Sequence, residues 1–227
     1  MRYDLHLHTC LSPCADDDMT PATVAGLAKL AGAELIAVTD HNSALNLPAA
    51  ETACRAYGLR LLPGIEVNTA EEMHLLCYFK TVERALEYGE ALYEALPAFP
   101  YDPAVWGEQL VMDEEDRVVR RVERLLTGAA RWDVYQAKAA CEALGGVALP
   151  AHADRSSYSL FAVLGAWPPD LDFAAVELYR PERREELEQW GLPPGIEVLT
   201  SSDAHCMEKV AGRLRELPEG SVLEKLL

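Results

Sequence analysis

Short apolar runs alternate with stretches of helical periodicity along most of the chain, and this alternation constrains the fold more than any other feature. The runs typical of buried strands are 5–7, 35–38, 59–67, 74–79, 147–149, 174–178 and 196–199. The segments between them that favour helices are 21–30, 49–57, 82–96 and 133–144. Strands that alternate with helices predict an α/β protein with a parallel sheet, either open or closed into a barrel.

Local signals mark several ends of these elements. Thr20 is a candidate N-cap, and Pro21 suits the first position of the helix that follows. Gly58 is placed to end the second helix. In the third strand Pro63 and Gly64 predict an interruption, because neither residue favours the interior of a sheet.

The stretch 97–131 departs from the alternation and predicts an insertion on the rim of the sheet. It contains Pro97, Pro100 and Pro103, and two short apolar runs flank an acidic turn at 113–116. We interpret these runs as a small hairpin, although the charges at 120–123 also permit a helix. Composition typical of a linker is absent, so we expect a single domain over residues 1–227.

The charge balance restricts the partners. The chain has 20 basic and 37 acidic residues, a formal net charge of −17. Such a surface repels a phosphate backbone, so a long nucleic acid is disfavoured as a partner, whereas a small phosphorylated substrate is compatible. Bound divalent cations would offset part of this charge.

No apolar run reaches the roughly 18 residues that a membrane helix needs, and the N-terminus has no signal-peptide pattern. We therefore expect a cytoplasmic protein without a membrane partner. The six cysteines then favour reduced thiols over a disulfide framework.

The six histidines lie at or near the ends of the expected strands, in the segments DLHLH, VTDH, EEMHLL, LPAH and SSDAH. His6 and His8 are two residues apart on a strand, so both side chains face the same way. Asp203 and His205 repeat this spacing. Because the carboxyl ends of parallel strands meet on one rim, we expect these side chains to gather there.

Glu66 closes the third apolar run, where a buried carboxylate is costly unless a cation or a donor compensates it. Imidazole and carboxylate ligands together suit zinc, iron or manganese better than calcium or magnesium. The sequence therefore predicts a transition-metal site at the carboxyl ends of the strands.

Other chemistries lack their motifs. The chain has no GxxxxGK phosphate loop, no GxSxG elbow and no GxGxxG that opens a helix. Ser201 and Ser202 stand beside Asp203 and His205, but neighbours on one strand end rarely converge as a triad must.

Five segments together resemble the polymerase-and-histidinol-phosphatase (PHP) family of metal-dependent phosphoesterases: DLHLHTCLSPCADDDMTP, IAVTDHN, LLPGIEVNTAEEMHLLCYF, LPAHADR and TSSDAH. The segments occur in the order that the family has them. The resemblance implies a distorted (β/α)7 barrel with the metal site at the C-terminal ends of the strands and a small inserted hairpin or helix on the rim.

The resemblance also implies two to three divalent cations, each with its own ligands. One cation would be held by His6, His8, Glu66 and Asp203, and Glu66 would bridge to a second held by His74 and His152. A third would be held by Asp16, His41 and His205, with Asp17 or Asp18 as alternatives to Asp16.

Four further residues are candidates for supporting roles. Arg155 follows His152 by three residues and would bind a phosphate, although a surface ion pair is an equal alternative. Glu177 would support a ligand, and Tyr158 and Arg180 are weaker candidates for substrate contact.

The function that follows is hydrolysis of a small phosphomonoester or nucleotide by metal-activated hydroxide, with catalytic roles for Glu66, Asp203 and His205. Three alternatives stay open: a 5'-3' exonuclease of short oligonucleotides, an amidohydrolase, and a non-catalytic metal-binding domain that docks a partner.

Overall fold

A computed structural model describes residues 1–98 and 101–227; Phe99 and Pro100, including one of the prolines of the expected insertion, lie outside the described residues. Its strands are β1 (Arg2–Leu7), β2 (Leu35–Val38), β3 (Arg60–Asn68), β4 (His74–Tyr78), β5 (Leu110–Met112), β6 (Val118–Arg121), β7 (Val147–Pro150), β8 (Ala175–Glu177), β9 (Glu197–Leu199) and β10 (Arg215–Glu216). Its α-helices are α1 (Pro21–Ala31), α2 (Leu47–Tyr57), α3 (Val82–Ala95), α4 (Pro103–Trp106), α5 (Val134–Ala143), α6 (Leu160–Leu164) and α7 (Arg184–Glu188).

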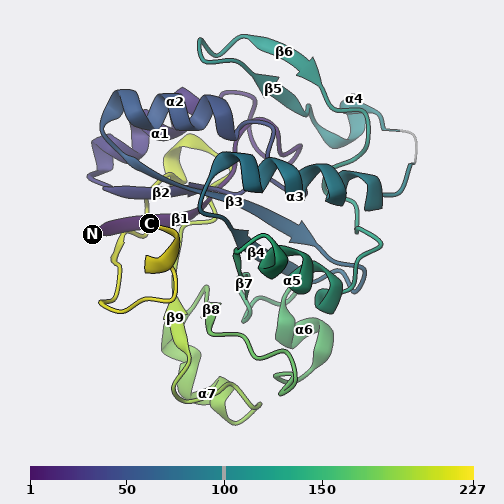
Figure 1. The fold of residues 1–227 in the computed structure, drawn as a ribbon, viewed down its shortest axis with the longest axis vertical. Helices are drawn as coiled ribbons and strands as arrows, with labels where there is room; N and C mark the ends of the chain where they lie inside the picture. The colour runs from purple at the N-terminus through teal and green to yellow at the C-terminus, as the bar shows by residue number, and fades with distance from the viewer. Residues whose placement is uncertain (99–100) are drawn as a thin grey trace.

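Six strands form one curled sheet in the order β10-β1-β2-β3-β4-β7, while β8 and β9 pair separately (Figure 1). A bridge between Leu7 and Ala204 ties the segment after β9 back to β1. At the other end, the amide of Ala153 donates to the carbonyl of Glu177 and ties β7 to β8. The α/β class is confirmed as a half-barrel, and closure into a (β/α)7 barrel stays a prediction.

The expectation of a wholly parallel sheet is wrong at two strands, the edge strand β10, which is antiparallel to β1, and β4. β1, β2 and β3 run parallel, but β4 is antiparallel to both β3 and β7. The short segment between Asn68 and His74 returns the chain as a hairpin, whereas a parallel neighbour needs a long crossover. The start of β4 therefore lies on the same rim as the carboxyl ends of its neighbours.

The third strand is also continuous, contrary to the interruption that Pro63 and Gly64 predict. Pro63 pairs with Val38 in β2, and its carbonyl accepts from Phe79. A Cβ on Gly64 would lie 2.7 Å from Thr39 Cγ2 and 3.1 Å from Tyr78 Cδ1. Gly64 thus permits close packing inside the strand.

Two apolar layers enclose the sheet because its residues alternate between faces. Ile36 and Ile65 point toward the layer beneath α1, α2 and α3, which lie together on one side in Figure 1. Leu35, Leu62 and Leu76 point into a second cluster on the opposite face. Glu66 shares the face of Leu62, four residues farther along β3, and so stands above this cluster.

The insertion forms the expected hairpin from β5 and β6 and not the alternative helix, and α4 precedes it. It extends from the sheet beside α3 (Figure 1). Other helix ends follow the sequence: Thr20 caps α1 by accepting from the amide of Thr23, and Gly58 ends α2 in the left-handed conformation.

Candidate metal centre

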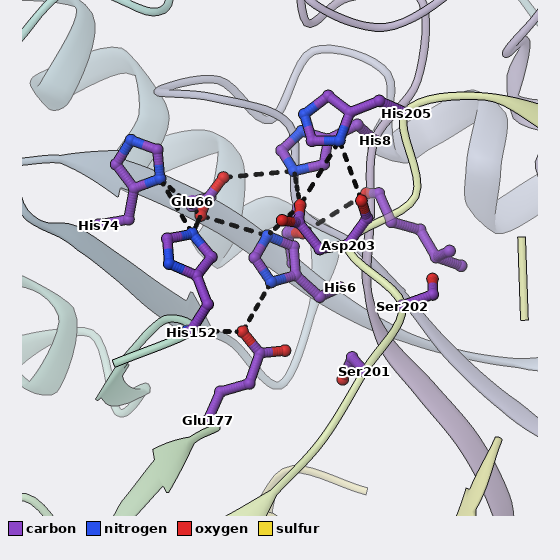
Figure 2. Close-up of polar contacts among 12 residues, drawn as sticks. His6, His8, Glu66, His74, His152, Glu177, Ser201, Ser202, Asp203 and His205 are labelled. Carbon is purple, nitrogen blue, oxygen red and sulfur yellow. Dashed lines mark hydrogen bonds and ion pairs between the residues drawn. The ribbon is translucent and has the colours of Figure 1, made fainter. Parts of the chain in front are cut away.

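Glu66 lies among buried imidazoles, of which His6, His8, His74 and His152 are labelled around it in Figure 2. Its Oε1 is 2.9 to 3.2 Å from a ring nitrogen of His6, His74 and His152. Its Oε2 is 3.2 Å from His8 Nε2 and 3.1 Å from His41 Nδ1. The Glu66 side chain is only 1% exposed, so water does not solvate its charge, and only buried neighbours or a bound cation can compensate it.

Asp203 supplies the second carboxylate of the centre. Its Oδ1 is 3.3 Å from His6 Nε2 and 3.4 Å from His8 Nε2. His205 lies next to it, with Nδ1 3.0 Å from the Asp203 carbonyl oxygen. Arg155 contacts the outer oxygen, with Nη1 2.6 Å from Oδ2. The structure therefore brings Glu66 and Asp203, the two acids that the sequence analysis identifies, into contact with the same histidines.

The strand ends account for this convergence. His6 is in β1, Glu66 is in β3, His152 follows β7 and Asp203 follows β9. His74 is different, because it begins a strand where the sequence pattern associates these histidines with strand ends. It reaches the same rim because β4 is antiparallel.

The charges on the rings and acids depend on one another. Burial alone raises the pKa of Glu66, but His74, His6 and His41 outweigh it and hold that pKa well below its usual value. Burial lowers the pKa of His8, yet the neighbouring carboxylates of Asp203 and Glu66 prevail and raise it to about 9. For His41 burial prevails, and its pKa falls well below the usual value.

Several buried atoms of this cluster have no hydrogen-bond partner: His6 Nε2, His8 Nε2, His41 Nδ1 and Glu66 Oε2. Unpartnered polar atoms are costly in a protein interior, and they are rare. Here they face one another, with nitrogen and oxygen lone pairs that suit a divalent transition metal. The residues present therefore fit a metal.

Three groups of side chains have ligand atoms within 4.8 Å of one another: His6, His8, Glu66 and Asp203; His41, Glu66 and His74; and His8, His41 and His205. They share members and so form one continuous cluster. His152 adjoins it, with Nε2 3.3 Å from His74 Nδ1.

Asp16, Asp17 and Asp18 are exposed and take part in none of these groups among the described residues. Asp16 meets the cluster through its backbone, since its amide donates to the carbonyl oxygen of His205. His8 lies beside His41 and His205, the two histidines that the family resemblance groups with Asp16. The ligand role of Asp16 stays a prediction.

Glu177 orients two of the histidines, as expected of a supporting residue. Its Oε2 lies 2.9 Å from His6 Nδ1 and accepts from the His152 amide at 2.9 Å. An imidazole that donates Nδ1–H to a carboxylate leaves Nε2 free as a ligand. His152 has a φ of 27°, a backbone conformation that few residues other than glycine adopt, and this hydrogen bond helps to hold it.

Three supporting residues were missed by the sequence analysis. Ser12 Oγ is 3.0 Å from His8 Nδ1 and donates to Asp40 Oδ1. Asp40 also accepts from the amide and hydroxyl of Thr9. Asp4 accepts from the amides of Ser202 and Ala211, which fixes the loop that carries Asp203. The acids in DLHLH and VTDH were visible in the sequence, but their partners were not.

The remaining candidates lie around the cluster. The Arg155 guanidinium stacks on Tyr179, and Tyr158 stacks on His74 with ring centroids 5.0 Å apart. Arg180 lies 3.7 Å from Asp154 Oδ2 and so contributes to an ion pair. Ser201 and Ser202 stand apart from the imidazoles in Figure 2, which removes the geometric basis for a triad.

A pocket of about 720 Å³ opens directly beside His41 and His74. Its outer wall comes from the insertion and includes Trp106 and Leu125. A volume between about 300 and 1,000 Å³ is typical of small-molecule sites.

The family model described as "PHP domain" matches residues 4–114, which include His6, His8, His41, Glu66 and His74. Residues 4–114 are therefore similar to the PHP domain family. The residues beyond this match add His152, Asp203 and His205 to the same cluster.

In sequence, the chain is similar to the 5'-3' exoribonuclease Rnm of Salmonella typhimurium, with which it is 38% identical over 74 residues. The match covers 32% of this chain and 24% of that protein, so the similarity spans about a quarter of its length. A name that refers to RNA runs against the expectation, drawn from net charge, that nucleic acid is disfavoured.

Solved structures share the fold of this chain at low sequence identity. A candidate metal-dependent phosphoesterase of Bifidobacterium adolescentis is 19% identical with a TM-score of 0.62, over 89% of this chain and 87% of that one. An amidohydrolase of Chromobacterium violaceum, solved with bound sulfate and no metal, is also 19% identical with a TM-score of 0.60, over 95% and 92%. Endonuclease Q of Pyrococcus furiosus is 18% identical with a TM-score of 0.56, over 91% and 49%.

Two simpler expectations concern the rest of the chain. All six cysteines are free thiols. Among the described residues, no helix has the length and hydropathy to cross a membrane.

Proposed function

We propose that this protein is a metal-dependent phosphoesterase that hydrolyses a small phosphomonoester or nucleotide. The observation that carries the proposal is the buried Glu66 carboxylate with five imidazole nitrogens within 3.2 Å of its oxygens. Burial of so many polar groups costs free energy, which a purely structural role does not explain. The cluster also borders a pocket whose volume suits a small molecule.

The ligands divide among up to three cations. His6, His8, Glu66 and Asp203 would hold the first, and His74 and His152 would hold a second together with Glu66. His41 and His205 would hold a third with Asp16, the ligand that the sequence analysis expects there. The donor set of imidazoles and carboxylates suits zinc, manganese or iron.

Bound divalent cations would lower the pKa of a coordinated water to about 7 and offset the charge that builds up on the phosphoryl oxygens. The chain's own residues then have three tasks. Glu66 and Asp203 keep the centre negative and ordered, and His205 lies at its open side, with a side chain 26% exposed. Glu177 holds His6 and His152 in place through Oε2.

Arg155 would bind the phosphate of the substrate. Its guanidinium is fixed between Asp203 and the ring of Tyr179, and its side chain remains 35% exposed. A planar guanidinium held in this way offers its other N–H groups to phosphoryl oxygens.

A 5'-3' exonuclease that acts on short oligonucleotides is the second candidate. The similarity to an exoribonuclease, 38% identical over 74 residues, favours it. The net charge of −17 still disfavours a long polyanion unless bound cations neutralise part of it.

One experiment tests the proposal and separates these candidates. The full chain, purified without chelator, is analysed for bound metals and then assayed for phosphate release from nucleoside monophosphates, sugar phosphates and amino-alcohol phosphates. Short 5'-phosphorylated oligoribonucleotides are assayed in parallel, together with simple amides as substrates of an amidohydrolase.

We expect at least two equivalents of transition metal and phosphate release from a small monoester. Turnover restricted to oligonucleotides would favour the exonuclease. Turnover of amides alone, or a protein with less than two equivalents of metal and no hydrolysis, would overturn the proposal, the latter in favour of a partner-docking domain.

A further inference from the structure

The pocket beside the metal cluster has two chemically different ends. Its inner end is formed by His41 and His74, whose Nδ1 atoms lie 3.1 and 2.9 Å from Glu66. Its outer end is formed by Pro97, Leu125 and the aromatic rings of Trp106 and Tyr158. A molecule that reaches the cluster from this pocket therefore extends over an apolar and aromatic surface.

Trp106 is only partly packed against the described part of the chain. It ends α4, a helix of four residues without a buried side chain, and it is 52% exposed. A tryptophan left half in water costs hydrophobic free energy that a polar residue would not. Exposed aromatic residues of this kind are common where a protein stacks on a flat ring.

The charged residues that line the outer end of the pocket make it unsuited to a second phosphate. Among the described residues that line it there is no lysine or arginine, and Glu72 adds a negative charge. Arg155 instead contacts Asp203, which does not line this pocket. The phosphate and the uncharged part of a substrate are thus directed to different places.

We infer that this pocket binds the nucleobase of a nucleotide, stacked on Trp106, while the phosphate lies at the metal cluster. The inference rests on the proposed function and narrows its substrate class from phosphomonoesters in general to nucleotides and 5'-terminal nucleotides of short strands. Stacking tolerates any base because every base has a π face.

The wall between the two ends adds a polar contact. Asn68 lies in this wall, is 2% exposed, and fixes the insertion by donating from Nδ2 to the carbonyl of Thr127 at 3.0 Å. Its Oδ1 is a buried acceptor without a hydrogen-bond partner. An unpartnered acceptor at the pocket wall suits the amino group of a base such as adenine.

The test uses Trp106→Ala in the full chain loaded with Mn²⁺, with AMP and ribose 5-phosphate as paired substrates. Val105→Ala is the matched control, because Val105 is the adjacent residue of the same helix, is 69% exposed and does not line the pocket. Trp106→Phe keeps a flat ring and serves as the rescue variant.

We expect Trp106→Ala to raise the KM for AMP about tenfold or more, as the loss of one stacking partner implies, with little change in kcat. Ribose 5-phosphate has no base, so its KM should stay the same in every variant. Trp106→Phe should restore most of the affinity for AMP, and Val105→Ala should behave like the unmodified protein.

A second measurement is independent of catalysis: ligand-observed NMR of adenosine with the metal-free chain and with each variant. Binding of adenosine that Trp106→Ala weakens supports the inference even if no phosphate is released, in which case only the proposed function fails. Equal KM increases for AMP and ribose 5-phosphate, or adenosine binding that is absent or unchanged in Trp106→Ala, would overturn the inference.

Discussion

The metal cluster, which forms a floor next to the pocket, and the outer wall of the pocket are built in opposite ways. The floor includes side chains such as His6 and Glu66, which are almost fully buried. The wall comes from the insertion, where α4 buries no residue and every residue of β6 is exposed. A rigid, dehydrated floor suits precise ligand geometry, and an exposed wall can vary without disturbing it.

The largest effect expected from this difference is the loss of Glu66. Glu66→Gln conserves the volume but removes the charge that five imidazoles share. We expect bound metal to fall below one equivalent and phosphate release to be abolished, measured by elemental analysis and phosphate assay. Circular dichroism should still report a folded chain.

Glu51→Gln is the matched control, since this side chain is 50% exposed on α2 and lies outside the described cluster. Metal content and turnover equal to those of the unmodified protein in Glu66→Gln would refute the central position of Glu66.

Removal of the metal should destabilise the floor more than the wall. A cation present at about 100 times its Kd stabilises the folded chain by about 2.7 kcal/mol. For a chain of 227 residues this corresponds to a rise in Tm of about 5 to 10 °C. Thermal unfolding before and after dialysis against a chelator, followed by Mn²⁺ or Zn²⁺ addition, measures the rise.

The Tm of Glu66→Gln should respond weakly to the same additions. If the metal raised the Tm of both proteins equally, it would be binding somewhere other than this cluster.

A smaller effect is expected from Glu177→Gln, because Glu177 acts through His6 and His152. Loss of such an outer partner commonly lowers metal affinity about 10- to 100-fold. Competition with a fluorescent chelator would measure the change, and raising the metal concentration should restore turnover. Glu182→Gln, an exposed acid in the turn after β8, is the control. Turnover that excess metal failed to restore would mean that Glu177 has a task beyond positioning ligands.

The floor could be predicted largely from the sequence, because its residues lie where chain direction and strand periodicity leave little choice. Positions at or near the ends of apolar runs were sufficient to identify four candidates: Glu66, Asp203, His6 and His8. His74 converged for a different reason than expected, since periodicity identifies a strand but not its direction. Only the pairing of β4 with β3 and β7 puts its first residue on the rim.

The contacts between distant loops could not be predicted. Ser12 links His8 to Asp40 across 28 residues of sequence, and no spacing rule relates a hydroxyl in one loop to a carboxylate after another strand. Asp16 illustrates the same limit: counting along the loop predicts a carboxylate ligand, whereas in the fold that side chain is exposed and His8 lies beside His41 and His205, so its ligand role stays a prediction. The hairpin of the insertion was predictable, but its nearness to the pocket was not.

The smallest effect on stability and activity is expected from a substitution in the part of the insertion that does not line the pocket. Val119 in β6 is 60% exposed and does not line the pocket. Val119→Thr keeps the β-branched shape and strand propensity, so the free energy of unfolding should change by less than about 0.5 kcal/mol. Metal content and the KM for AMP should also stay unchanged, measured by denaturant titration, elemental analysis and the phosphate assay. A loss of metal in this variant would mean that the hairpin is coupled to the floor through Asn42, which donates to the carbonyls of Leu126 and Gly128 at the base of the insertion. In that case the insertion and the floor would form one cooperative unit, and the freedom of the wall to vary would be smaller than its exposure indicates.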